Sequence, residues 1–87
     1  MKTMLDVVSE IAFNECKNGN FVEYNFLFDK VEAELKTKWE ILASESGKDY
    51  SVIRVNKLGE LYRLLTVDSN FIRNSKGQWS IRPGFTI

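Results

Sequence analysis

Histidine is absent from this 87-residue sequence, and cysteine and proline occur once each. Without histidine, the chain lacks the commonest general acid–base and the commonest metal ligand, and one cysteine leaves no recognisable zinc arrangement. A lone thiol has no disulfide partner within the chain, which favours a reducing compartment. No apolar run approaches the roughly 18 residues of a membrane span, and acidic residues interrupt the stretch that a signal peptide would need. We therefore expect a cytoplasmic protein with no membrane contact.

The remaining polar residues indicate no catalytic centre. The five glycines are scattered and form no phosphate-binding motif. Cys16 has no base beside it and falls on the apolar side of a predicted helix, so a core position is the better interpretation. Glu32 and Glu34 are two positions apart on a predicted helix and do not face each other. The sequence therefore predicts a protein that is not an enzyme and that binds no cofactor or metal.

Charge is balanced overall but unevenly distributed. The chain has 12 Lys and Arg and 12 Asp and Glu, which gives no net charge. Residues 1–49 hold 6 basic and 10 acidic side chains (6 − 10 = −4), whereas residues 50–87 hold 6 basic and 2 acidic (6 − 2 = +4). The length and the 44% hydrophobic content fit one domain with a single modest core. We infer a dipolar domain whose C-terminal half could face an anionic partner.

A first helix is predicted over residues 3–18. Thr3 and Asp6 form a capping pair at its start, and Asn18-Gly19 supplies its stop. Phe13 lies off the apolar side of this helix. It either packs under the C-terminal hairpin or remains partly exposed.

A short strand is predicted over residues 21–24, followed by a second helix with Asn25 as its cap. The apolar spacing of this helix continues through Trp39. The helix therefore either runs on to about residue 44 or bends near Thr37.

A loop is predicted over residues 44–53, because Gly47 lies in a cluster of helix-breaking residues. Trp39, Ile41 and Tyr50 lie in or near this region. They either enlarge the core or form a partner-binding surface, since exposed aromatic clusters tend to mark interfaces.

The stretch over residues 57–82 predicts a helix, a short turn and a two-stranded hairpin, with Asn56 as the N-cap of the helix. Residues 71–73 and 79–81 are the predicted strands, and Asn74-Ser75-Lys76-Gly77 is a turn-forming run. The side chains expected to share one interior between helix and hairpin are Tyr62, Leu65, Phe71, Trp79 and Ile81. This order of elements is typical of the end of a winged helix-turn-helix domain.

The same stretch resembles the N-terminal domain of the delta subunit of bacterial RNA polymerase, a winged-helix group called HARE-HTH. The residues that match this family without a gap are Tyr62, Leu65, Val67-Asp68, Phe71, Ser75, Trp79 and Arg82. A weaker match runs from Val22 to Leu35. The resemblance implies an α+β winged helix-turn-helix fold with three helices and a small three-stranded antiparallel sheet. The whole of residues 1–87 is then one domain, with a longer connection around residues 37–53 than the family has.

The resemblance also implies a function: a non-catalytic accessory subunit domain that binds core RNA polymerase and modulates transcription. In the family, a disordered acidic tail follows the domain, whereas this sequence ends at Gly84-Phe85-Thr86-Ile87. The apolar Phe85 and Ile87 predict that this end packs back on the fold. We expect a monomer.

Two alternatives remain: a DNA-binding winged-helix regulator, or a free-standing protein-interaction module. The candidate contacts with a partner or with nucleic acid are Arg54, Lys57, Arg63, Arg73, Lys76 and Arg82. Glu60 lies between two of these cations, and Gly59 and Leu64 stand where a DNA reader usually has long polar side chains. We therefore expect a protein partner, with at most a weak DNA contact.

Overall fold

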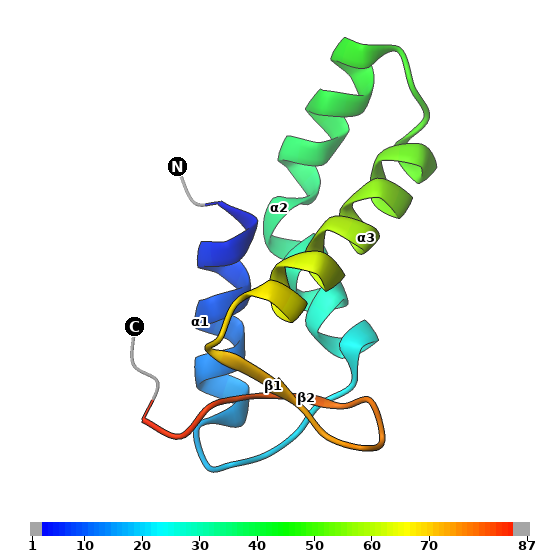
Figure 1. The fold of residues 1–87 in the computed structure, drawn as a ribbon. Coiled ribbons are helices and arrows are strands. Elements are labelled where there is room, and N and C mark those ends of the chain that lie inside the picture. The colour runs from blue at the N-terminus through cyan, green and yellow to red at the C-terminus, as the bar shows by residue number, and fades with distance from the viewer. Residues whose placement is uncertain (1–2, 85–87) are drawn as a thin grey trace.

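The computed structural model describes residues 3–84 and has three helices followed by one two-stranded antiparallel sheet (Figure 1). This is the expected α+β class. The elements are α1 (Met4–Cys16), α2 (Tyr24–Ser46), α3 (Tyr50–Val67), β1 (Phe71–Arg73) and β2 (Trp79–Ile81). Within residues 3–84, no helix combines the length and the apolar character needed to cross a membrane. The expected packing of Phe85 and Ile87 concerns residues outside this range.

The start of α1 is a capping box, as predicted. The Thr3 hydroxyl oxygen accepts from the Asp6 backbone N–H at 3.1 Å, and an Asp6 carboxylate oxygen accepts from the Thr3 N–H at 3.1 Å. Two N–H groups that have no partner within the helix are thereby satisfied. Cys16, the last residue of α1, is buried in the expected core position. Phe13 is half-buried and lines a groove against the hairpin.

The second helix begins earlier and extends further than predicted. Glu23 is its N-cap, so the prediction that Asn25 caps it is wrong; Asn25 lies within the first turn. The helix ends at Gly47, whose φ of 70° allows its N–H to bond back to the last turn. Phe28 and Trp39 lie eleven positions apart, about 16 Å along a straight helix, yet their ring centroids are 5.8 Å apart. The two side chains must therefore extend along α2 toward each other, and Figure 1 shows that α2 is bent and not straight.

The third helix corrects the predicted loop over residues 44–53. It begins at Tyr50, with Asp49 as N-cap, so Asn56 lies inside the helix and is not its cap. Only residues 47–49 separate α2 from α3, and the connection expected around residues 37–53 is therefore mostly helical. Contacts with α2 explain the early start, because Ile53 is buried in the core and the Tyr50 hydroxyl donates to Glu32.

The hairpin has the predicted bounds. The Asn74 side-chain oxygen accepts from the backbone N–H groups of Lys76 and Gln78, at 3.0 and 2.9 Å, and Gly77 has a φ of 79°. The predicted strand over residues 21–24 is reduced to a single bridge between Val22 and Trp79, so the sheet has two strands.

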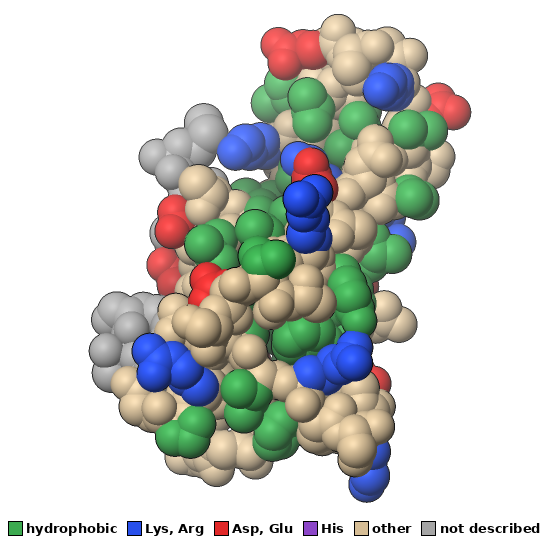
Figure 2. Space-filling view, in the orientation of Figure 1, with side chains coloured by type: hydrophobic (Ala, Val, Ile, Leu, Met, Phe, Trp, Pro, Cys, Tyr) green, Lys and Arg blue, Asp and Glu red, His purple; other side chains and the backbone are tan. Residues whose placement is uncertain are grey.

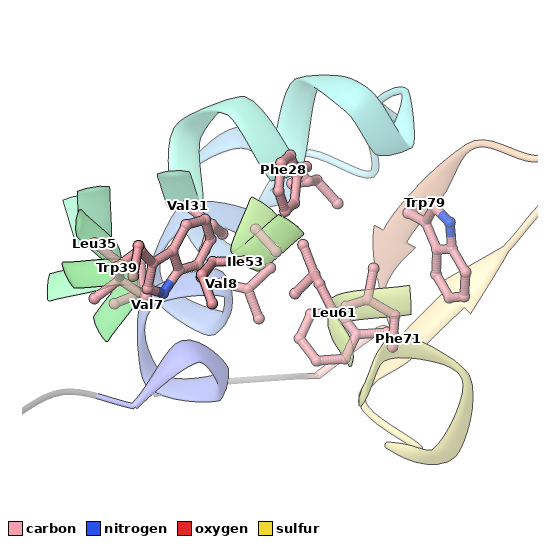
Figure 3. Close-up of a cluster of buried hydrophobic side chains, with 14 residues drawn as sticks. Val7, Val8, Phe28, Val31, Leu35, Trp39, Ile53, Leu61, Phe71 and Trp79 are labelled. Carbon is pink, nitrogen blue, oxygen red and sulfur yellow. The ribbon is translucent and has the colours of Figure 1, made fainter. Parts of the chain in front are cut away.

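The core joins all three helices to the sheet. Figure 3 shows Trp39, Val31 and Leu35 on one side of this cluster and Trp79 on the other. Its buried members are Val7, Val8, Ala12, Leu27, Phe28, Val31, Leu35, Trp39, Ala43, Ile53, Leu61, Leu65, Phe71 and Trp79.

Candidate interaction surface

The hairpin is fixed against the end of α3 by Trp79. This side chain is 3% exposed, and the Tyr62 ring meets it edge-on with centroids 6.0 Å apart. Leu65 and Phe71 are buried beside it, as predicted. Tyr62, however, is 41% exposed, so its expected place inside the core is only partly correct. Its ring lies at the edge of the core and presents its hydroxyl to the surface.

Backbone and side-chain bonds also fasten β2 to the loop before α2. Val22 and Trp79 exchange two backbone hydrogen bonds of 2.8 Å each. The buried Ser80 hydroxyl donates to the Asn20 carbonyl at 2.7 Å. The hairpin is therefore held between α3 and this loop, which sets the positions of the charged side chains that it carries.

Arg54, the first predicted contact residue, is engaged with α2. Its Nε donates to Glu32 at 3.1 Å, a terminal nitrogen lies 3.7 Å from Asp29, and its guanidinium lies over the Phe28 ring at 4.9 Å. Tyr50 donates to the same Glu32 carboxylate at 2.6 Å. Arg54 therefore serves to hold α3 on α2.

The ionisation of this cluster follows from its contacts. Burial by itself would raise the pKa of Glu32, but the Tyr50 hydroxyl and the Arg54 guanidinium outweigh it, and the pKa lies below its usual value. Burial and the neighbouring Glu32 carboxylate raise the pKa of Tyr50 to about 12. Near neutral pH, a neutral phenol and a guanidinium therefore share one carboxylate.

Lys57 is also compensated within the chain. Its ammonium lies 3.0 Å from a Glu60 carboxylate oxygen, one turn further along α3, and its side chain is 24% exposed. The positive charge expected at this part of α3 is thus largely cancelled.

Arg63 and Lys76 lie on the surface without internal partners. Both residues are exposed, and within residues 3–84 neither side chain has a hydrogen bond or an ion pair. Arg63 lies on the last turns of α3, and Lys76 lies in the turn of the hairpin. These two cations are available to a partner.

Within residues 3–84, Arg73 and Arg82 bond only to neutral groups. Arg73 donates to the Tyr62 hydroxyl at 2.6 Å, and its guanidinium lies 5.9 Å from the centre of the Trp79 ring. Arg82 donates from Nε to the Asn70 side-chain oxygen at 2.9 Å. These bonds orient two exposed guanidinium groups without cancelling their charge.

Four of the six predicted contacts therefore belong to the hairpin end of the molecule. We call Arg63, Arg73, Lys76 and Arg82 the cationic face. On the side seen in Figure 2, Lys and Arg side chains lie around the hairpin end, separated by apolar and uncharged surface. Arg54 and Lys57 lie nearer the other end of α3 and are not part of this face.

The outward side of α3 mixes apolar and polar side chains. Val52 and Val55 are 45% and 64% exposed there, and Gly59 has open space around it. Exposed apolar side chains suit a protein contact. Asn56 and Arg63 are exposed on the same helix and are the side chains there of the kind that bond to base edges.

Trp39, Ile41 and Tyr50, proposed above as an alternative partner-binding surface, do not form one surface in the structure. Trp39 is 2% exposed and belongs to the core, Tyr50 bonds to Glu32, and Ile41 is 54% exposed. Ile41 lines a groove of about 660 Å³ where α2 extends past the start of α1. Its apolar lining residues are Met4, Val7, Leu35, Trp39, Ile41 and Leu42.

Sequence reasoning missed the residues that compensate the inner cations. Asp29 and Glu32 precede Arg54 by 25 and 22 positions, so no local spacing signals the pairing. By contrast, the Lys57–Glu60 pair has the local three-residue spacing that helices use for such contacts.

The described part of the chain holds no group of three or more His, Cys, Asp or Glu side chains that could bind a metal ion. No protein-family model matches the sequence, and no significant similarity to a curated protein or to a solved structure was found.

Proposed function

We propose that this chain is a winged-helix domain that acts as a non-catalytic accessory subunit domain of bacterial RNA polymerase. It resembles the delta subunit and modulates transcription by binding the core enzyme. Under this proposal the domain works in the cytoplasm as a monomer.

The observation that carries the proposal is the docking of the hairpin on α3. The residues that resemble the delta family include Leu65, Phe71 and Trp79, and these three pack together in the core. Their likeness to the family thus involves the side chains that orient the hairpin. The Val22–Trp79 bridge supports the winged-helix assignment, because it pairs the predicted first strand with β2 at one point.

The surface favours a protein partner over sequence-specific DNA binding. A DNA-reading helix presents long polar side chains to base edges, whereas the outward side of α3 presents Val52, Val55 and Gly59 beside the exposed Asn56 and Arg63. Lys57 is paired with Glu60, which lowers the positive charge that phosphates would meet on this helix.

Retention of core polymerase tests the proposal. The tagged chain, incubated with purified core enzyme from the same organism, should retain it at moderate salt. Loss of retention would contradict the assignment. A gel-shift titration at two salt concentrations tests the DNA-binding alternative, since specific binding should survive competitor DNA.

A further inference from the structure

We infer that the cationic face docks an acidic segment of the protein partner. This inference rests on the proposed function and specifies which surface of the domain makes the contact. It depends on the charge of four exposed side chains, Arg63, Arg73, Lys76 and Arg82, none of which has an acidic partner within residues 3–84.

The local balance of charge makes this face complementary to an anion. Between residues 50 and 84 the chain has only two acidic side chains, Glu60 and Asp68. Glu60 is paired with Lys57, and Asp68 accepts from the Asn70 backbone N–H at 2.8 Å. At the other end of α3, Arg54 is held by carboxylates of α2. The carboxylates nearest the hairpin are Asp68 and Glu23, the second of which accepts from the Gln78 side chain at 3.0 Å. Against these two, the four cations leave the hairpin end with a net positive charge.

Two of the cations lie on different sides of the hairpin. The Arg82 N–H donates to the Asn70 carbonyl at 2.9 Å, so Arg82 lies beside Asn70 at the base of β1. Arg73 follows Asn70 by three positions, and successive side chains of a strand point to opposite faces. Arg73 therefore lies on the face that meets Trp79 and Tyr62, whereas Arg82 bonds to the Asn70 side chain. The positive charge is thus spread around the hairpin end and does not form a row of fixed spacing.

Apolar surface beside these cations favours a protein segment over a nucleic acid. Tyr62 is 41% exposed and Val67 is 73% exposed, and both lie on the last turns of α3 with Arg63. An acidic segment with an apolar side chain between its carboxylates could contact both kinds of surface. Phosphate binding would gain nothing from Val67.

Substituting Arg63 and Lys76 tests the docking surface most directly, because within residues 3–84 their side chains make no hydrogen bond or ion pair that the change would break. The double variant Arg63→Gln, Lys76→Gln should keep the melting temperature of the parent. The matched control is Lys36→Gln, Lys48→Gln, which removes the same charge from two exposed lysines on or next to α2.

The probe is a short fluorescein-labelled glutamate-rich peptide, measured by fluorescence anisotropy at low and at physiological ionic strength. We expect the parent chain to bind it and the Arg63, Lys76 variant to bind about threefold to tenfold more weakly, as the loss of two exposed charge contacts implies. The control variant should stay within about twofold of the parent. Binding should weaken as salt screens the charges.

Three results would overturn the inference: no binding at low ionic strength, equal weakening in the control variant, or displacement of the peptide by a lower concentration of single-stranded or duplex DNA. The polymerase experiment separates the two proposals. If core enzyme retains the parent and the Arg63, Lys76 variant equally, the docking surface is wrong and the proposed function stands. If it does not retain the parent, the proposed function fails.

Discussion

At the scale of single residues, Trp79 carries a buried donor without a partner. Its side chain is 3% exposed, and its indole Nε1 has no hydrogen-bond partner within residues 3–84. An unsatisfied buried donor costs roughly 1–3 kcal/mol. The large ring is nevertheless retained between α3 and the loop before α2, so its packing must outweigh this cost.

Two substitutions of Trp79 should separate packing from the unsatisfied donor. We expect Trp79→Ala to lower the free energy of unfolding by about 3–5 kcal/mol, as for other buried aromatic residues. Trp79→Phe should cost only about 1 kcal/mol, because it keeps a ring and removes the orphan N–H. Urea unfolding measures both. A cost below about 1 kcal/mol for Trp79→Ala would mean that the hairpin is not docked on α3.

The Glu32 carboxylate should make stability depend on acid pH. Its pKa is lowered in the folded state by Tyr50 and Arg54, which outweigh the effect of burial. A lowered folded pKa gives stability that is present above the unfolded value, near 4.3, and that is lost as pH falls through the folded pKa. Glu32→Gln should therefore flatten the fall in melting temperature below about pH 5. Glu34→Gln, at an exposed position two residues on, is the control.

At the scale of the elements, Gly59 and Gly77 provide a matched pair. A Cβ added at either position would meet nothing within 4 Å, so only the backbone distinguishes them. Gly59 lies inside α3, and Gly59→Ala should stabilise the fold by about 0.5–1 kcal/mol. Gly77 has a φ of 79°, and Gly77→Ala should destabilise by about 1–2 kcal/mol. Thermal unfolding of both variants checks this, and equal shifts would contradict it.

The elements also differ in how far the sequence predicts them. The hairpin was predicted with its observed bounds because its turn depends on bonds among residues 74–78, all within five positions. The start of α3 was missed because the helix-breaking cluster around Gly47 predicts a loop as far as residue 53, whereas the helix resumes at Tyr50. Helix forms there because Ile53 is buried and because α2 supplies partners from distant parts of the sequence.

The candidate site follows the same rule. Its exposed cations could be found from the sequence, because an excess of Lys and Arg after residue 50 is visible in the composition. The sequence does not show which of these cations remain available to a partner. Arg54, for example, is neutralised by Asp29 and Glu32, which lie on another helix. Pairing between distant segments is decided by the packing of α2 on α3.

At the scale of the whole molecule, the two ends differ in how they are supported. The hairpin end brings α1, α3 and the sheet together. The C-terminal half of α2 and the N-terminal half of α3 instead extend beyond the start of α1, and we call this part the far end (Figure 1). The far end has Trp39 and Ala43 as its buried side chains on α2, and its groove is open to solvent. Regions with fewer packed layers open more readily.

Trp39→Ala should therefore loosen one end of the molecule selectively. Truncating this buried ring removes its stacking on Phe28. If the chain unfolds as one cooperative unit, the free energy of unfolding should fall by about 3–5 kcal/mol. Because the far end rests on two helices, we expect hydrogen exchange to accelerate most for backbone amides of residues 38–55, while Leu65 and Trp79 remain comparatively protected. Ile41→Ala, at a side chain that is 54% exposed, should leave both regions unchanged. Uniform acceleration along the chain would instead mean that α2 couples the far end to the hairpin in one cooperative unit, so that Trp39 supports the cationic face from a distance.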